Sequence, residues 1–198
     1  MPAVLLVAAQ RVFFRGLFVF NSIVTLIIDT VAGMLAGVLL LRFWMQAIRV
    51  RPPHSVGQFI FQLSDWLVLP LRKVFPGVGG YDWASLIGAI ALAVLASLLE
   101  VALFGAVDAQ LILLVTCART CNWILYGFMG MILIGAVFSW INPHAPLAPF
   151  VASLSEPLLR PLRRIIPLVG NVDLSPLAAL LLLQIAMVLV RSLMASSF

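Results

Sequence analysis

Charged residues are scarce in this sequence. Only 10% of its 198 residues are Asp, Glu, Lys or Arg, whereas 64% are hydrophobic. A soluble domain carries about 25% charged residues, so this composition and the mean hydropathy of +1.18 exclude an ordinary water-soluble domain. Most of the chain must therefore lie in lipid.

Cysteine and histidine are rare, which limits metal and redox chemistry. Cys117 and Cys121 are the only cysteines, four residues apart on one helical face. Free cysteines are usually buried apolar residues, and two thiols are too few ligands for a metal site, so a redox or metal role is the less favoured alternative. His54 and His144 each follow a proline and are interpreted as loop residues, with a shared metal site as the alternative.

Recognisable catalytic motifs are also missing. The chain has no Walker loop, no dinucleotide-binding fingerprint and no zinc spacing, and its residues suggest no Ser-His-acid set. We therefore expect no enzymatic activity and no cofactor.

Four apolar runs are long enough to cross a bilayer core of roughly 30 Å, which takes about 20 helical residues. They are 21–41, 84–107, 120–141 and 174–194. Backbone groups in lipid must be satisfied internally, and the runs lack the alternation of barrel strands. The sequence predicts an all-α membrane protein with four transmembrane helices.

Two segments beside these runs leave alternatives open. Residues 1–20 form an aromatic-rich lead that either lies at the membrane surface or extends the first span. Residues 108–119 are apolar but too short to cross alone, and a helix joining them to the third run would be about 46 Å long. We expect an outer-side connector with a short surface helix and a break near Arg119, or else a re-entrant segment.

One polar segment occurs twice. Aligning Ser64 with Ser155, an offset of 91 positions, makes nine residues of the first copy recur in the second. They are Ser64, Leu67, Pro70, Leu71, Arg72, Pro76, Val78, Gly79 and Asp82. Two further positions keep their charge: Asp65 with Glu156, and Lys73 with Arg164. The chain is therefore interpreted as two tandem span–amphipathic connector–span repeats, 21–107 and 120–198, in parallel orientation.

Positive charge is distributed unequally between the two sides. Eight basic residues lie in the connectors: Arg42, Arg49, Arg51, Arg72, Lys73, Arg160, Arg163 and Arg164. Four lie on the opposite side: Arg11, Arg15, Arg119 and Arg191. This asymmetry predicts cytoplasmic connectors and outward-facing termini. The net charge of +5 is attributed to orientation and to anionic lipid headgroups rather than to nucleic acid.

Each connector begins with an amphipathic stretch. The apolar positions at helical spacing are Val56, Phe59, Ile60, Leu63 and Leu67 in the first copy, and Leu147, Phe150, Val151, Leu154 and Leu158 in the second. Such a helix either lies in the headgroup plane or packs against the spans.

A short basic segment follows each amphipathic stretch. Pro70 and Pro161 suit the first turn of a helix, and Pro76 and Pro167 limit that helix to about two turns. Its basic face either anchors the chain to lipid phosphate or docks a partner or an anionic ligand. The candidate residues for both roles are Arg72, Lys73, Arg163 and Arg164.

A turn and a helix cap complete each connector. Gly79 and Gly170 allow a tight turn. Asp82 and Asp173 come directly before the next span, where a carboxylate can cap the free amides and suits the helix dipole.

Three charged residues lie within the spans and are functional candidates by default. They are Asp29, Glu100 and Arg191, all expected in the outer half of the bilayer. An ion pair between helices is the favoured interpretation, and a proton or cation path or snorkelling to the interface are the alternatives.

The two segments "SDWLVLPLRKVFPGVGGYDWASL" and "SEPLLRPLRRIIPLVGNVDLSPL" together resemble the signature of the YggT family, called YlmG in Gram-positive bacteria. That signature is roughly D/E-P-L-L-x-P-x-R-R-x-x-P-x-x-G-x-x-D-x-S-P. The second copy matches nearly throughout. The first departs at Trp66, where proline is usual, and at Ala84 and Ser85, where Ser-Pro is usual.

The resemblance implies a small integral membrane protein of the bacterial inner membrane or of plastids. Family members are associated with cell division or envelope maintenance and with osmotic tolerance, and in plastids with nucleoid distribution and cytochrome assembly. No catalytic residues carry over. We expect a scaffold or assembly factor whose connectors meet a protein partner, and a homo-oligomer is compatible with the pattern. The alternative is a small transporter or channel subunit that uses Asp29 and Glu100.

Overall fold

The computed structural model of the chain describes residues 2–104, 109–166 and 173–195. In this part, helices are joined by turns, with one isolated β-bridge between Val78 and Tyr81. The helices are α1 (Pro2–Ala47), α2 (His54–Val74), α3 (Trp83–Phe104), α4 (Ala109–Ile141), α5 (Ala148–Ile165) and α6 (Ser175–Ala195). Four of them, α1, α3, α4 and α6, are long and apolar enough to cross a membrane. The predicted all-α membrane architecture is confirmed.

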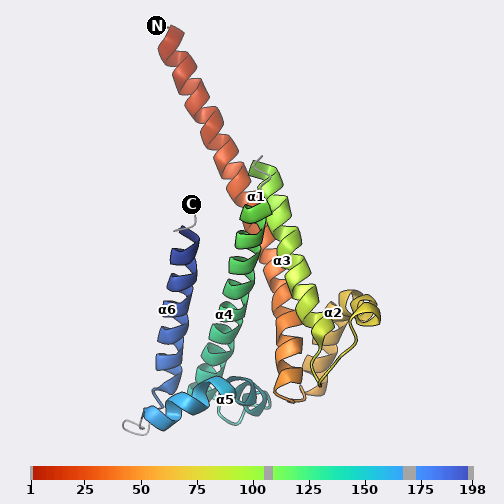
Figure 1. The fold of residues 1–198 in the computed structure, drawn as a ribbon. Coiled ribbons are helices and arrows are strands. Elements are labelled where there is room, and N and C mark those ends of the chain that lie inside the picture. Colours follow the sequence, from red (N-terminus) through yellow and green to blue (C-terminus); the bar gives the residue numbers. More distant parts are fainter. Residues whose placement is uncertain (1, 105–108, 167–172, 196–198) are drawn as a thin grey trace.

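Helix α1 is longer than a bilayer core requires. Its 46 residues extend about 69 Å at 1.5 Å per residue, and its apolar span alone covers Gly16–Ala47. Residues 2–20 continue the same helix, so the lead segment extends the first span. Figure 1 shows this end of α1 projecting beyond the other helices.

Helix α4 corrects the expectation for residues 108–119. It runs unbroken for 33 residues and passes through Arg119, so both the break near Arg119 and the re-entrant segment are wrong. Residues 109–126 contain neither proline nor glycine, and therefore nothing in them interrupts a helix. The resulting length of about 50 Å exceeds the hydrocarbon core, which takes about 30 Å.

Helices α2 and α5 each combine the amphipathic stretch and the basic segment. Pro70 lies inside α2, and Pro157 and Pro161 lie inside α5, so the expectation that Pro70 and Pro161 begin separate helices is wrong. All three prolines are on exposed positions. A proline inside a helix has no amide hydrogen to donate to the carbonyl four residues earlier, and its ring bends the helix at that point.

The turn after α2 has the predicted conformation. Gly79 and Gly80 have φ angles of 69° and 84°, which disfavour residues with a Cβ atom. The amide of Tyr81 donates to the carbonyl of Val78 at 3.3 Å and closes the turn. Gly170 and Pro167 of the second copy lie outside the described residues.

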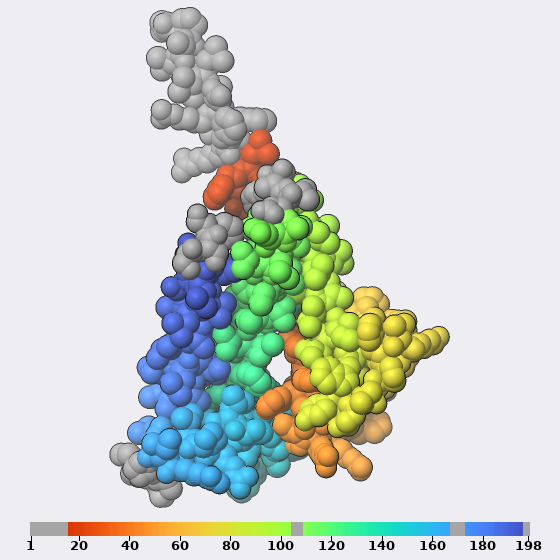
Figure 2. Space-filling model, viewed as in Figure 1, coloured from red at the N-terminus to blue at the C-terminus, as the bar shows by residue number. Residues whose placement is uncertain are grey.

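Each connector helix packs against the two spans of its own repeat. Helix α2 contacts α1 and α3, and α5 contacts α4 and α6. Figures 1 and 2 show both connector helices at the same end of the molecule, opposite the N-terminus of α1. Ile60 and Leu154 of the predicted stripes are buried, whereas Phe59 is 60% exposed, so the apolar face of α2 is narrower than predicted.

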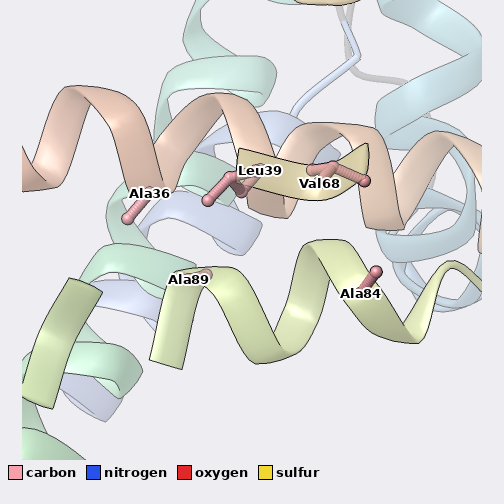
Figure 3. Packing of buried hydrophobic residues seen from close by; sticks show 5 residues of the cluster. All are labelled: Ala36, Leu39, Val68, Ala84 and Ala89. Carbon is pink, nitrogen blue, oxygen red and sulfur yellow. The ribbon is translucent and has the colours of Figure 1, made fainter. Parts of the chain in front are cut away.

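Small residues dominate the packing inside the first repeat. The core of α1, α2 and α3 is shown in Figure 3 and consists of Ala36, Leu39, Val68, Ala84 and Ala89. Alanine lets helix backbones approach closely, which is how membrane helices associate without a hydrophobic driving force. The second repeat has its own cluster of Ile132, Leu159 and Ala179.

The two repeats meet near the connector end. Met45, Ile60 and Leu154 form a shared apolar cluster, and the indole nitrogen of Trp44 donates to the carbonyl of Leu154 at 3.0 Å. Next to it, Phe128 contacts Trp44 edge-on with ring centroids 4.9 Å apart. An apolar cavity of about 370 Å³ between α1, α3 and α4 borders this contact, and Figure 2 shows the surface open between α4 and the first repeat.

Candidate functional site

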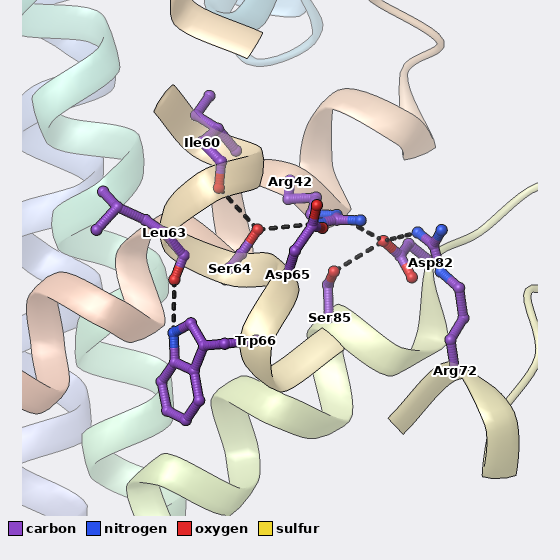
Figure 4. Close-up of polar contacts among 9 residues, drawn as sticks. All are labelled: Arg42, Ile60, Leu63, Ser64, Asp65, Trp66, Arg72, Asp82 and Ser85. Carbon is purple, nitrogen blue, oxygen red and sulfur yellow. Dashed lines mark hydrogen bonds and ion pairs between the residues drawn. The ribbon is translucent and has the colours of Figure 1, made fainter. Parts of the chain in front are cut away.

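The first connector is organised around Arg42, at the connector end of α1 (Figure 4). Its Nη1 donates to Asp65 Oδ1 at 2.6 Å and to Ser64 Oγ at 2.7 Å. Its Nε donates to Asp82 Oδ2 at 3.1 Å. Arg42 is only 6% exposed, and a buried guanidinium must be paired and hydrogen-bonded in this way. One side chain thus ties α1 to α2 and to the start of α3.

Asp82 is the second centre of this network. Its Oδ2 also accepts hydrogen bonds from Arg72 Nη2 at 2.7 Å and from Ser85 Oγ at 2.8 Å. The carboxylate is 1% exposed. Arg42 and Arg72 are balanced by Asp65 and Asp82, so the network of four charged groups is neutral and none of its buried charges is left unpaired.

The arginines keep Asp82 ionised. Burial alone would raise the pKa of its carboxyl, but hydrogen bonds from Arg72 and Ser85 and the charges of Arg72 and Arg42 lower that pKa below the ordinary value of 3.8. The side chain therefore acts as a charge partner for arginine. Within the described residues no backbone amide donates to it; the amides of Ser85 and Leu86 bond to the Asp82 carbonyl instead.

The second connector is simpler and more exposed. Arg163 Nη1 donates to Glu156 Oε2 at 2.6 Å, and its Nε donates to Asp173 Oδ2 at 2.8 Å. Asp173 Oδ1 accepts the amide of Ser175 at 2.9 Å, which is the expected capping geometry at the start of α6. Burial alone would raise the pKa of Asp173, but hydrogen bonding by Ser175 and the charge of Arg163 lower it.

The second repeat has no counterpart of Arg42. When Trp44 is aligned with Trp140, Phe138 occupies the place of Arg42. Arg163 then serves both carboxylates alone, and its side chain is 45% exposed. The sequence analysis includes Arg42 only among the eight basic residues that predict orientation. The difference between Arg42 and Phe138, each two residues before a tryptophan of its repeat, is the sequence signal that could have identified its structural role.

The four candidate docking or anchor residues divide into two pairs. Arg72 and Arg163, at equivalent positions, are engaged in internal ion pairs. Lys73 and Arg164, the next residues, are exposed and form no hydrogen bond or ion pair with the described part of the chain. Within these four residues, only the second pair lacks an internal charge partner among the described residues.

The charges within the spans form a triad that sequence reasoning only partly anticipated. Arg119 Nη1 lies 2.7 Å from Asp29 Oδ1, and its Nη2 donates to Glu100 Oε2. These contacts join α4 to α1 and α3. Arg191 is elsewhere and donates to the hydroxyl of Tyr126 at 3.2 Å. Asp29 and Glu100 are thus paired with Arg119 and not with Arg191. Arg119 itself was predicted to lie at a helix break on the membrane surface.

Helix lengths place this triad far from the connectors. At 1.5 Å per residue, Asp29 lies about 27 Å from the end of α1, and Glu100 lies about 26 Å from the start of α3. Arg119 lies about 33 Å from Ile141, the end of α4. A hydrocarbon core is about 30 Å thick, so the triad lies near its opposite boundary. A cavity of about 720 Å³ adjoins Asp29 and Arg119 and is also lined by Asn122.

The remaining candidates show no assembled metal site. Cys117 is exposed, Cys121 is half-buried, and both are unbridged. His54 begins α2, and His144 lies in the turn before α5. Among the residues that the structure describes, no three His, Cys, Asp or Glu side chains form a group that could hold a metal ion.

Known proteins match most of the chain. The sequence model of the CCB3/YggT family matches residues 21–104 and 114–194, one segment for each repeat. The uncharacterized protein YggT of Escherichia coli K12 is 33% identical over 81% of this chain and 85% of its own length. The uncharacterized protein PA0392 of Pseudomonas aeruginosa is 33% identical over 86% and 89% of the two chains. No solved structure matches. The chain belongs to the CCB3/YggT family.

Proposed function

We propose that this integral membrane protein is a non-catalytic scaffold or assembly factor of the bacterial inner membrane. It presents its two basic connectors to the cytoplasm and supports cell envelope, cell division or osmotic functions there. The proposal is supported by one observation above all: two equivalent connectors lie at the same end of the molecule (Figure 1). In each, the basic residue that directly follows the internally paired arginine has no ion pair with the described residues.

The internal ion pairs fix what the connectors present. Arg72 and Arg163 bind carboxylates that precede the next span, so each connector is tied to the membrane helices. Lys73 and Arg164 then extend from helices that pack against the spans, at equivalent positions of the two repeats. Two preplaced cations favour a partner with acidic or phosphorylated groups, because charge complementarity sets specificity and association rate.

A crosslinking experiment in native membranes tests this proposal. A photoreactive residue at position 73 or 164 should capture one defined partner, whereas the same residue at Leu177, an exposed apolar position near the start of α6, should capture mainly lipid. The double variant Lys73→Gln/Arg164→Gln should lose the partner while its abundance in the membrane stays normal. Unchanged capture by that variant would contradict a docking role of these cations.

Topology is part of the proposal and has its own measurement. In a background without Cys117 and Cys121, a cysteine at the exposed Ser55 should react with an impermeant thiol reagent only after the cytoplasmic side is opened. A cysteine at the exposed Gly16 should react from outside. The opposite labelling pattern would place the connectors on the outer side.

A second candidate function rests on the triad and its cavity. Asp29 is 46% exposed at its side chain and borders the cavity of about 720 Å³, which suits a proton or cation path in a transporter or channel subunit. Purified protein in liposomes should then conduct protons or cations, and Asp29→Asn should abolish the flux. Liposomes without measurable flux would favour the scaffold.

A further inference from the structure

A pocket of about 620 Å³ opens beside the first connector, between the end of α1, the segment 48–53 and α2. Four of its lining residues are arginines: Arg42, Arg49, Arg51 and Arg72. The apolar part of the lining includes Met45, Val50, Phe61 and Leu69. We call this hollow the arginine pocket.

The arginine pocket has an excess of positive charge. Arg42 and Arg72 are balanced by Asp65 and Asp82, as described above. Arg49 and Arg51 are exposed and form no ion pair with the described residues. About two positive charges therefore remain for a ligand, and guanidinium groups suit phosphate because their planar donors match its oxygens.

The backbone at Arg49 is a second, independent indication. The amide of Val50 donates to the carbonyl of Met45 at 2.9 Å, and the amide of Arg49 donates to that of Gln46 at 3.1 Å. This is a Schellman motif with Arg49 at the position that glycine usually occupies. Arg49 has a φ of 58°, a conformation that residues with a Cβ adopt at a cost. Such strain is typically retained where the side chain has a task.

We propose that the arginine pocket binds a phosphate group. The site is specific to the first repeat, because Phe138 occupies the place of Arg42 in the second and the connector residues 142–147 contain no lysine or arginine. Arg49 and Arg51 supply the free charge, and Arg42 and Arg72 form a preorganised wall. The proposal is independent of a protein partner at Lys73 and Arg164, neither of which lines the pocket.

Two sources can supply the phosphate. The headgroup of an anionic phospholipid fits the position of the pocket, because the spans end there and apolar side chains such as Phe61 and Leu69 can accommodate the glycerol and upper acyl region. A soluble phosphate compound would use the same arginines without the apolar wall. The experiment separates the two.

The test uses the purified full chain in neutral detergent and short-chain lipids as probes. Dioctanoyl phosphatidylglycerol should bind at least tenfold more tightly than dioctanoyl phosphatidylcholine. Arg51→Gln should weaken phosphatidylglycerol binding roughly fivefold, the loss typical of one basic contact. Arg160→Gln is the matched control: Arg160 is an exposed arginine of α5 outside the pocket, so its removal changes the net charge equally but should leave the affinity unchanged.

Arg49→Gly separates binding from folding. Glycine relieves the strained cap, so this variant should unfold at a temperature no lower than the wild type and yet bind phosphatidylglycerol more weakly. If millimolar inorganic phosphate displaces phosphatidylglycerol, and this displacement requires Arg51, the ligand of the pocket is a soluble phosphate compound. If phosphatidylglycerol binds and inorganic phosphate does not displace it, the ligand is the lipid. Equal affinities for the two lipids, without competition by phosphate, would overturn the proposal, as would equal losses in Arg51→Gln and Arg160→Gln.

Discussion

The two connectors share nine residues in the same order, yet they are built differently. In the first, Arg42 of α1 forms an ion pair with Asp65, and both Arg42 and Arg72 form ion pairs with the buried Asp82. In the second, no residue of α4 plays this part, and Arg163 alone joins Glu156 to Asp173 near the surface. The repeated motif therefore supplies one arginine and two carboxylates in each connector, and Arg42, a residue outside the motif, changes how they pair in the first.

The two repeats differ in what holds each connector helix to its membrane spans. A buried ion pair is a weak contributor to net stability, but breaking one is costly because a charge is left uncompensated. An exposed pair is worth about 0–1 kcal/mol. The first connector is thus fixed to its spans, whereas the second depends on apolar contacts such as Leu159 with Ile132.

Removing Arg42 should have the largest effect. Arg42→Met leaves Asp82 with Arg72 as its sole cationic partner and leaves Asp65 unpaired, so we expect a loss of about 3 kcal/mol, near the lower end for a broken buried pair. The measurement is unfolding of the purified protein in mixed micelles. Arg163→Met, the control in the second connector, should lose less than about 1 kcal/mol. Similar losses in the two variants would mean that burial does not distinguish the connectors.

The two aspartates should differ in what replaces them. Asp82→Ala should cost about 2 kcal/mol, because two arginines lose a charged acceptor, and Asp82→Asn should rescue little, because an amide brings no negative charge. Asp173→Ala should cost about 1 kcal/mol, the usual value for a helix cap, and Asp173→Asn should largely rescue it. The same micelle unfolding assay measures all four variants. Full rescue by Asn at position 82 would show that Asp82 acts as a cap after all.

Acid should weaken the first connector more than the second. The pKa values of Asp82 and Asp173 are both lowered in the folded protein, so their contribution to stability is complete above the ordinary pKa of 3.8 and is lost as the pH falls through the lower folded values. Unfolding midpoints should be flat from pH 6 to about pH 4 and should decline below it. Asp82→Asn should flatten this decline more than Asp173→Asn does. An equal decline in Asp82→Asn and the wild type would exclude Asp82 as its main source.

The sequence predicted the four spans, the tandem repeats and the Gly79 turn, because each depends on local composition or on order along the chain. It did not predict the roles of Arg42 and Arg119. Both act across helices, and which faces of α1, α3 and α4 meet is decided by packing that no single segment encodes. The similar distances of Asp29, Glu100 and Arg119 from the connector ends of their helices were a partial indication that the three side chains meet. The helix break expected near Arg119 prevented this comparison.

The smallest expected effect concerns the shape of the two equivalent arginines. Arg72 uses one nitrogen, Nη2, on one carboxylate, and a lysine ammonium can replace such a contact. Arg163 uses Nε and Nη1 on two different carboxylates, a bridging geometry that depends on the guanidinium fork. Arg72→Lys should therefore be almost neutral in stability, and Arg163→Lys should lose a few tenths of a kcal/mol, because the pairs are half-exposed.

This asymmetry also changes what lysine substitutions can say about docking. A loss of function in Arg163→Lys would have an internal explanation, since Asp173 or Glu156 would lose its partner, and it would not by itself indicate a ligand. The informative substitution is Arg164→Lys, whose side chain has no partner in the described part of the chain. If Arg164→Lys loses partner capture while its stability equals the wild type, the free cation acts through its fork on an external carboxylate or phosphate. If capture persists, charge alone is sufficient there, as a lipid anchor requires.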